Sequence, residues 1–350
     1  MRKMTRLVIV ALAMAVVSPL VSSPATSIAG GKPKFMNLNK APKTKISGKD
    51  ILEGLEEYVR KFPLRQNGLP GNTGAADFLA KEATKYGFKS TIREFQVKQA
   101  NAIPRTVRVV ESIKKGTKKP NEWIALVAHY DAVAPDGVGL TVEGAYDPAS
   151  GANMLRFFGK AFSKIKTKRS IALIWFDAEE NGLLASKPYA EYVYKRGQKI
   201  QMVMGFDMVG IGYPARYCTC VWHGPNPGNP ELVVPLNEHV NHKFLKFPKN
   251  NLPSGQQRFP TGGEPHFCNC GISSRNSDES SFVRIGGKPA YHTLRWSGMR
   301  AALDYPGYHM PWDNVPFMEQ VAGGRELLEG GMLNTFKSAY YSTLVLDNLK

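Results

Sequence analysis

Trp123-Ile124-Ala125-Leu126-Val127-Ala128-His129-Tyr130-Asp131 is the stretch around which the rest of the chain is organised. Its apolar run, bounded by polar residues, predicts a buried strand, so His129 and Asp131 should emerge where that strand meets its loop. Because side chains alternate along a strand, residues i and i+2 lie on the same side and bring one carboxylate against one imidazole. Such a pair is typical of a metal ligand oriented by a carboxylate, and equally of a buried histidine satisfied by its neighbour.

Strands and helices alternate after this stretch. A helix is predicted after Gly151 and another from about 184 to 196, while apolar runs at 171–176 and 202–206 predict further strands. This order is typical of parallel strands covered by helices. We therefore expect an α/β fold with a mixed, largely parallel central sheet sandwiched between helices.

The flanking regions carry weaker patterns. Ser47 and Asn72 are the expected N-caps of two helices, and strands are expected at about 89–96 and 106–111. Residues 217–300 look loop-rich. The C-terminal part, from Asp313 onward, begins as a loop and becomes a helix that its two glycine pairs should weaken.

The first 29 residues have a composition of their own. Basic residues precede an apolar run at 7–17, and a Ser/Ala-rich tract follows, which together indicate a secretory signal peptide too short to span a bilayer. We expect a signal peptide at 1–29, a flexible lead-in at 30–46 and a single domain at 47–350. The mature chain would be secreted, to the extracellular space or the periplasm, with no stable membrane anchor.

Composition excludes some partners and constrains the cysteines. The formal charge of +17 is spread along the chain without a long basic block, so no nucleic-acid partner is expected. Two Cys-x-Cys units stand at 218–220 and 268–270. In a reduced compartment they would indicate a zinc knuckle, but an exported chain favours disulfides. Because a bridge within one unit is strained, we predict that Cys218 and Cys220 pair with Cys268 and Cys270.

Acidic residues stand where three further strands or loops end: Asp147, Glu179, Glu180 and Asp207. In a parallel sheet they would converge with His129 on one edge. Burying several carboxylates together is unfavourable unless a cation neutralises them. Histidine with carboxylate oxygens suits zinc, and several carboxylates suit two metals bridged by one of them.

A second histidine ligand is expected in the segment Tyr308-His309-Met310-Pro311-Trp312-Asp313. Pro311 and the nearby glycine constrain this loop, and Asp313 is placed to orient His309. The remaining histidines have no motif and are expected to be surface or structural residues: His223, His239, His242, His266 and His292. Ser150 indicates a helix start, because no Gly-x-Ser-x-Gly elbow surrounds it.

Five motifs follow one another along the chain: His129-x-Asp131, Gly144-Ala-x-Asp147-x-x-Ser150-Gly151, Asp177-Ala-Glu179-Glu180-x-Gly182, Asp207-Met-Val-Gly210 and Tyr308-His309-x-Pro311-x-Asp313. From about residue 50 to the C-terminus, the chain resembles in motif order and spacing the secreted di-zinc aminopeptidases, which include bacterial leucyl aminopeptidase and aminopeptidase S. Ser277-Asp278 with Ser281-Phe282 also resembles the family's Ser-Asp segment, although the family often has His where Glu279 stands.

This resemblance implies a zinc exopeptidase domain of the phosphorylase/hydrolase-like type at 47–350, holding two Zn²⁺ ions bridged by Asp147. The further ligands that it implies are Glu180 and His309 on one ion, and His129 and Asp207 on the other. A cis peptide bond between Asp147 and Pro148 is implied as well.

The resemblance also implies two residues that act beside the ions. Asp131 would be the partner of His129, and Glu179 would be the general base. The chemistry supports the second role, because a water shared by two cations loses a proton near neutral pH and a free carboxylate can pass that proton to a leaving amine.

We therefore expect a secreted, monomeric zinc aminopeptidase that hydrolyses N-terminal residues from peptide substrates. A glutaminyl cyclase or a metallocarboxypeptidase on the same scaffold is the alternative enzyme, and the complete two-metal ligand set favours the aminopeptidase because the resembling cyclases work with one zinc. A non-catalytic binding protein is the alternative of another class. Intact Glu179 and all five ligands argue against it.

Overall fold

The computed structural model describes residues 33–98, 103–133, 142–211, 219–247, 267–272, 277–298 and 305–349, with only the backbone for 219, 220 and 267–272. The predicted signal peptide therefore lies outside the described residues. In the part that is described, no helix combines the length and the apolar character that crossing a membrane requires.

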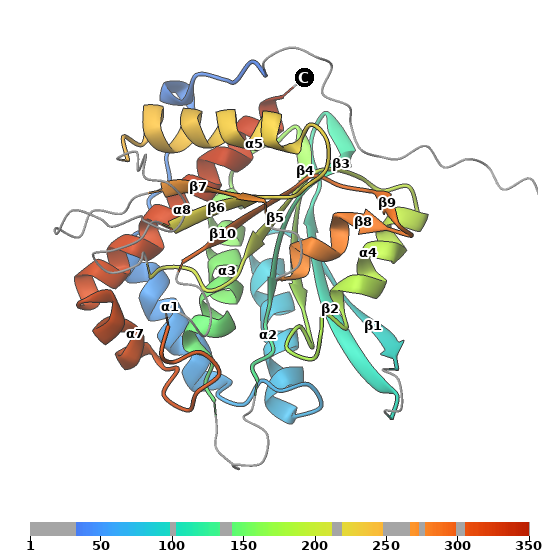
Figure 1. Ribbon diagram of the computed structural model, residues 1–350, viewed down its shortest axis with the longest axis vertical. Helices are drawn as coiled ribbons and strands as arrows, with labels where there is room; N and C mark the ends of the chain where they lie inside the picture. Colours follow the sequence, from blue (N-terminus) through green and yellow to red (C-terminus); the bar gives the residue numbers. More distant parts are fainter. Residues whose placement is uncertain are drawn as a thin grey trace, which may run out of the picture.

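A mixed sheet forms the centre of the molecule (Figure 1). In the described residues it has eight strands in the order β1-β2-β4-β3-β5-β10-β6-β7. The strands are β1 Lys89–Val97, β2 Arg105–Lys114, β3 Lys119–His129, β4 Arg169–Phe176, β5 Lys199–Phe206, β6 Thr219–His223, β7 Phe267–Ile272 and β10 Thr293–Ser297. Neighbouring pairs among β4, β3, β5 and β10 are parallel, whereas β1 and β2 are antiparallel. The predicted fold class is confirmed.

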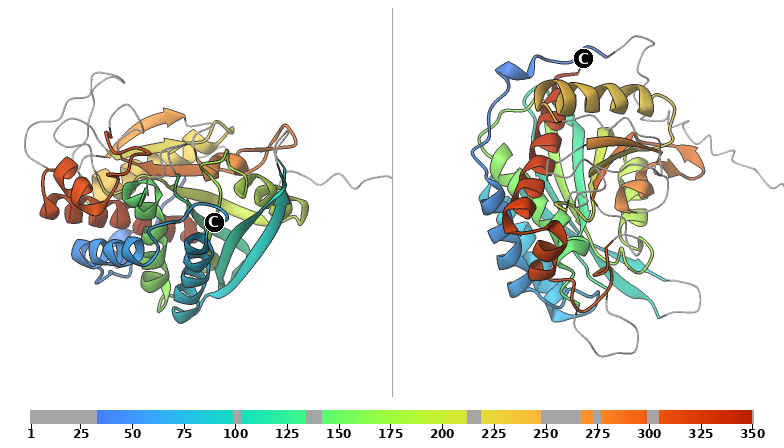
Figure 2. Two further views of the ribbon diagram at one scale, coloured as in Figure 1. Left: turned by 90° about the horizontal axis from the view of Figure 1, so that it is seen from below. Right: turned by 60° about the vertical axis from the view of Figure 1, so that its left-hand side comes forward.

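Helices cover both faces of this sheet. They are α1 Gly48–Lys61, α2 Pro70–Lys85, α3 Ser150–Phe162, α4 Ser186–Lys195, α5 Asn229–Asn237, α7 Val315–Ala322 and α8 Arg325–Asn348. Helices α1, α2, α3 and α8 contribute to one apolar cluster, and α4 contributes to a second cluster on the opposite face. The two rotated views in Figure 2 show α1, α2 and α3 side by side against one face.

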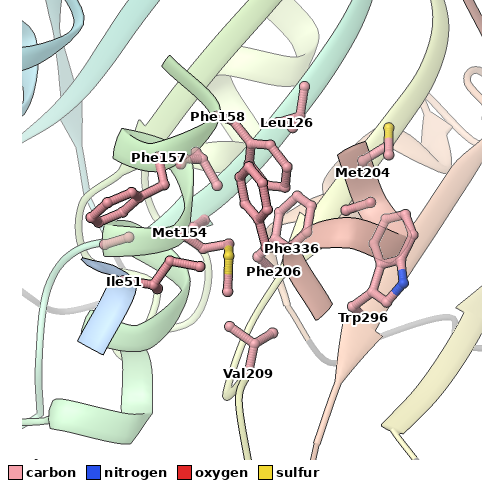
Figure 3. Packing of buried hydrophobic residues seen from close by; sticks show 14 of the residues in the cluster. Ile51, Leu126, Met154, Phe157, Phe158, Met204, Phe206, Val209, Trp296 and Phe336 are labelled. Atoms are coloured by element: carbon pink, nitrogen blue, oxygen red, sulfur yellow. The ribbon is translucent and has the colours of Figure 1, made fainter. Parts of the chain in front are cut away.

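The central strand β3 is buried on both faces. Leu126 and Ala128 belong to the larger cluster and Val127 to the smaller one, which explains why the run is apolar without alternation. Aromatic rings fill the larger cluster, with Phe158 stacked on Phe336 at 4.9 Å between ring centroids (Figure 3). His129 is the last residue of this strand, so the packed core holds its backbone at the sheet edge.

The two predicted N-caps have different outcomes. Ser47 caps α1 as predicted, and the structure adds a complete capping box with Asp50. The prediction for Asn72 is wrong, because α2 begins two residues earlier at Pro70, a residue that suits the first helical turn. The buried Asn72 side chain donates instead to the Arg65 carbonyl and to the Asp177 carboxylate.

The segment before α1 packs on the core. Leu38–Lys40 form a short 3₁₀ turn, and Leu38, Ala41 and Ile46 are buried. The Tyr340 hydroxyl of α8 donates to the Pro42 carbonyl. Within the predicted lead-in 30–46, the described residues 33–46 therefore contribute three apolar side chains to the core.

The region expected to be loop-rich supplies part of the sheet. Strands β6 and β10 have five residues each and β7 has six, and all three extend the sheet beyond β5. A small hairpin of β8 Arg284–Ile285 and β9 Lys288–Pro289 lies beside it. The predicted disulfides are untested, because the cysteine side chains lie outside the described part of the structure. The backbones of Cys220 in β6 and Cys268 in β7 are register partners.

The C-terminal helix is longer than the glycine pairs suggested. Gly323 and Gly324, both with positive φ, separate α7 from α8, whereas Gly330-Gly331 lies within α8. Burial of α8, which is complete over residues 338–347, compensates for the weak helix propensity of glycine.

Candidate metal centre

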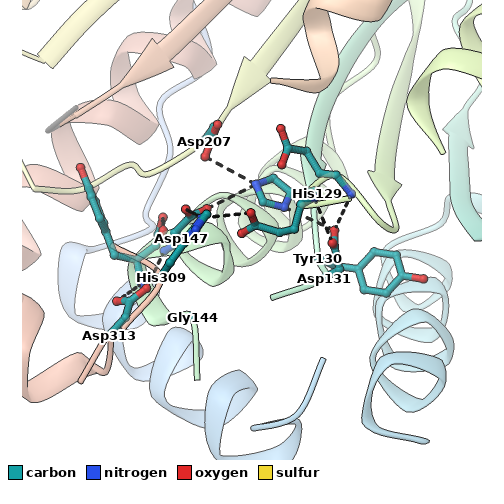
Figure 4. Close-up of polar contacts among 12 residues, drawn as sticks. His129, Tyr130, Asp131, Gly144, Asp147, Asp207, His309 and Asp313 are labelled. Carbon is teal, nitrogen blue, oxygen red and sulfur yellow. Dashed lines mark hydrogen bonds and ion pairs between the residues drawn. The ribbon is translucent and has the colours of Figure 1, made fainter. Parts of the chain in front are cut away.

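The sequence-predicted site residues converge on one edge of the sheet (Figure 4). His129 ends β3, Glu179 and Glu180 follow β4, Asp207 follows β5, Asp147 lies in the π-helical turn Ala145–Ala149 ahead of α3, and His309 lies in the loop before α7. Because β3, β4 and β5 are parallel, their carboxyl ends meet at this edge, where open α/β sheets build their sites.

Asp147 stands between two histidines. Its Oδ1 atom is 3.5 Å from His129 Nε2, and its Oδ2 atom is 3.4 Å from His309 Nε2. His129 Nε2 is also 3.6 Å from Asp207 Oδ1, while His309 Nε2 is 3.0 Å from Glu180 Oε2. Two groups of three donor atoms therefore share one carboxylate, with the atoms of each group within 4.8 Å of one another.

Several atoms of this cluster are buried without a hydrogen-bond partner. They include Glu180 Oε1 and Asp207 Oδ1. Each such atom costs about 1–3 kcal/mol of folding free energy if it stays unsatisfied. Two ligand atoms bound to one tetrahedral zinc are about 3.3–3.6 Å apart, close to the separations found here. The donor types, their spacing and their missing partners therefore fit two zinc ions.

Mutual interactions move the pKa values of these groups far from their usual range. Burial lowers the pKa of His309, but Asp147 and Glu180 outweigh it and raise this pKa to about 10. Burial raises the pKa of Glu180 to about 7, and the charge of Asp147 adds to it. Burial would also raise the pKa of Asp147, but the two histidines beside it hold the value at about 2. Without metal, the cluster therefore retains protons that a cation must displace.

Asp131 is positioned to act on both sides of the site. Its Oδ1 atom lies 3.4 Å from His129 Nδ1, and its carboxylate accepts hydrogen bonds from the backbone N–H groups of Glu179 and Glu180, at 3.0 and 3.3 Å. A single buried carboxylate thus orients one histidine and the turn that carries the glutamate pair. Sequence reasoning anticipated only the first contact.

The turn that carries Asp147 is held by Asp313. This carboxylate accepts hydrogen bonds from the backbone N–H groups of Tyr146 and Asp147, at 3.0 and 3.1 Å, and from the Tyr305 hydroxyl at 2.8 Å. Asp313, expected to orient His309, therefore orients Asp147. The peptide bond between Asp147 and Pro148 is cis, as expected.

Residues outside the motifs hold the surrounding loops. The fully buried Arg65 donates to the carbonyls of Tyr130, Glu143 and Gly144. It thereby ties together the loops that follow His129 and precede Asp147. Sequence reasoning missed Arg65, because its partners are backbone carbonyls that leave no residue signature.

The position where the resembling family often has His carries a buried ion pair. Glu279 is 2% exposed, and its Oε1 atom lies 3.7 Å from Arg295 Nε.

The histidines without a motif bond to backbone carbonyls where their contacts are described: His223 to Gly224, His239 to Met36 and His242 to Phe247. His266 lies outside the described residues.

Comparisons of the sequence identify a family and relatives. The model of peptidase family M28 matches residues 108–322. Aminopeptidase Y of Saccharomyces cerevisiae is 27% identical over 186 residues, which cover 48% of this chain and 32% of that protein. The chain spans about a third of the length of the curated relatives it matches.

Solved structures show the same fold. BSAP, a zinc aminopeptidase from Bacillus subtilis, has a TM-score of 0.64 at 13% identity, covering 86% of this chain and 96% of that one. A glutaminyl cyclase from Porphyromonas gingivalis has a TM-score of 0.60 at 15% identity, covering 83% and 97%. At such identities the similarity establishes the architecture, and the chemistry must be argued from the site.

Proposed function

The chain belongs to peptidase family M28, and from that premise we propose that it is a secreted zinc aminopeptidase that removes N-terminal residues from peptides. The observation that carries the proposal is the placement of Asp147, whose two oxygens face two different histidines at 3.5 and 3.4 Å. A carboxylate in this position suits a bridge between two metal ions.

Five side chains would hold the ions. The proposed ligands of one ion are His129, Asp207 and Asp147, and those of the other are His309, Glu180 and Asp147. When bound, two zinc ions supply positive charge that polarises a carbonyl oxygen and lowers the pKa of a water molecule to about 7. The sheet edge and the Asp313 contacts hold the ligands in place beforehand, so little reorganisation is needed on binding.

Glu179 is the proposed general base. A carboxylate oxygen of Glu179 lies within 4.8 Å of donor atoms of both His129 and Glu180, so it borders both ligand groups. Burial raises the pKa of Glu179 well above its ordinary value, and a general base acts best when its pKa lies near the working pH instead of far below it. Glu179 would take a proton from the attacking water and deliver it to the departing amine.

Asp131 supports this role through the backbone. Because it accepts a hydrogen bond from the Glu179 N–H while contacting His129, it keeps the base and a ligand in constant relative position. Neighbouring glutamates can then act differently, with Glu180 on the metal and Glu179 free for proton transfer. Secretion belongs to the same proposal and is supported by the composition of residues 1–29.

The test is turnover of a panel of aminoacyl anilides by the purified mature chain, before and after chelation and after zinc is returned. We expect activity that chelation abolishes and zinc restores. Glu179→Gln should keep two zinc ions per chain and lose about a hundredfold to ten-thousandfold in kcat. Glu53→Gln, at an exposed position of α1, is the matched control and should keep both zinc content and activity.

Two results would contradict the proposal. Near-normal turnover by zinc-loaded Glu179→Gln would remove Glu179 as the base. Cyclisation of N-terminal glutamine peptides, without anilide hydrolysis and with one zinc ion per chain, would favour the glutaminyl cyclase reaction instead.

A further inference from the structure

A cavity adjoins the proposed metal centre on the side of β2 and the start of α2. Its volume is about 730 Å³, within the range of small-ligand sites. Glu180 forms part of its wall, so the cavity borders the proposed metal centre, and the loop before α2 forms another part. Two arginines, Arg105 and Arg108, also line it.

The two arginines differ in how they are held. Arg108 donates from Nε to the half-exposed Glu94 at 3.0 Å and from its guanidinium to Thr73 Oγ1 at 2.9 Å. Arg105 is exposed, and among the described residues its side chain has neither an ion pair nor a hydrogen bond. The cavity therefore presents one cation in a defined position and one that is free to meet a ligand.

Glu94 compensates the charge of Arg108, whereas among the described residues no carboxylate pairs with Arg105. Among its described lining residues the one carboxylate is Glu180, which is a proposed metal ligand. The start of α2, where Leu69 makes no side-chain cap, adds a small positive potential, although the arginines carry the argument. A cavity with this charge attracts anions and repels cations.

This polarity decides which part of a peptide can enter. The N-terminal amine has a pKa of about 7.7–8.0 and is mostly cationic near neutral pH, so the unpaired Arg105 repels it. The cavity is therefore suited to the departing part of the substrate, beyond the bond that is cut.

We propose that this cavity binds a carboxylate on the departing part of the substrate, so that peptides with an acidic group there are cleaved preferentially. The carboxylate is either an Asp or Glu side chain or the C-terminus of a short peptide. The inference rests on the proposed aminopeptidase function and adds to it the chemical class of substrate.

Matched peptide pairs separate the two sources of the carboxylate. Leu-Asp-Gly-amide against Leu-Asn-Gly-amide and Leu-Gly-Asp-amide against Leu-Gly-Asn-amide test side chains, and Leu-Gly-Gly against its amide tests the C-terminus. We expect the acidic member of at least one pair to have a kcat/KM about two to ten times higher at low salt, the range of an exposed ion pair. The preference should shrink as salt is added.

Variants then assign the preference to the arginines. Arg105→Glu should bring the acid-to-amide ratio of kcat/KM to one or below, and Arg108→Gln should reduce it. Because the acid-to-amide ratio compares two peptides on the same variant, a general change in activity does not affect it. Lys81→Glu, an equal change of charge at an exposed position of α2 outside the cavity, should leave the ratio as it is.

A binding measurement makes the test independent of turnover. Zinc-loaded Glu179→Gln is titrated calorimetrically with the same unlabelled peptide pairs, in the Arg105 and Arg105→Glu backgrounds. A chain that hydrolyses no anilide overturns the proposed function, whereas the cavity is still judged by binding. Equal affinity for acidic and amide peptides, or a preference that survives Arg105→Glu and Arg108→Gln together, overturns the inference.

Discussion

Replacing Asp313 by asparagine tests whether this residue maintains the geometry of Asp147. The substitution keeps the shape of the side chain and removes one acceptor. In the native site Oδ1 accepts from the Tyr146 N–H and the Tyr305 hydroxyl, and Oδ2 accepts from the Asp147 N–H. Two of the three partners are backbone N–H groups that cannot accept, one at each oxygen, so an amide NH₂ in either position faces a backbone N–H.

The loss of stability follows from the number of backbone N–H groups that lose their acceptor. If the asparagine carbonyl takes the place of Oδ1, its NH₂ group faces the Asp147 N–H, which is buried and left unpaired at about 1–3 kcal/mol. Burial raises the pKa of Asp313 to about 7, although its three hydrogen bonds lower it. The comparison therefore belongs above pH 7, where the native carboxylate is ionised. We expect the free energy of unfolding to fall by about 1–3 kcal/mol and zinc affinity to fall about 10- to 100-fold.

Urea unfolding of the metal-free chain and competition with a zinc chelator measure the two effects. Tyr305→Phe is the control, because it removes one donor and leaves both backbone N–H groups paired. It should lower stability by about 0.5–1.5 kcal/mol with little change in zinc affinity. If Asp313→Asn matches the native chain in both stability and zinc affinity, Asp313 does not position Asp147.

Two further predictions concern protons and cysteines. Zinc affinity should rise with pH, by up to about tenfold per unit for each displaced proton, because in the metal-free site the pKa of His309 is raised to about 10 and that of Glu180 to about 7. The contact of protonated His309 with its carboxylates stabilises the metal-free fold fully below the unfolded pKa of about 6.5 and is lost as pH rises through about 10. Calorimetric zinc titrations in two buffers would detect the released protons, and a pH-independent affinity would contradict this. For the cysteines, we expect a non-reduced digest to show Cys218 and Cys220 bridged to the segment 268–270, and free thiols would show this pairing to be wrong.

The sheet edge could be predicted because its signals are local. The central strands are continuous apolar runs, and a residue that follows such a run in a parallel sheet must lie at the carboxyl edge. His129, Glu180 and Asp207 each occupy such a position. Their convergence follows from strand order and needs no knowledge of side-chain contacts.

The supporting contacts could not be predicted in the same way. Arg65 reaches the Tyr130 carbonyl across 65 residues, and Asp313 reaches the Tyr146 N–H across 167. Asn72 carried a capping signal, yet burial beside Asp177 decided its role. These interactions join side chains to distant backbone or buried groups, so neither periodicity nor local spacing reveals them. The short strands β6 and β10 were missed for a related reason, since five residues are too few for a clear pattern.

Glu279 stands where the resembling family often has His, and neighbouring residues accommodate its buried carboxylate. In the parallel pair of β5 and β10, Gly205 and Arg295 are register partners. A side chain at Gly205 would place its Cβ atom 2.7 Å from Glu279 Oε2, so the glycine leaves the space that the glutamate fills. Arg295 then supplies the opposite charge, which a buried carboxylate requires.

This compensation leaves the proposed ligands in place. Asp207 follows β5 only two residues after Gly205, yet it remains 3.6 Å from His129. Burial raises the pKa of Glu279, and Arg295 opposes this effect. Replacing Arg295 alone would leave a buried carboxylate next to the metal centre without its partner, whereas replacing Glu279 and Arg295 together removes both charges. The two residues are therefore best understood as one unit, which explains how the chain departs from the family at position 279 while keeping the arrangement of its five proposed ligands.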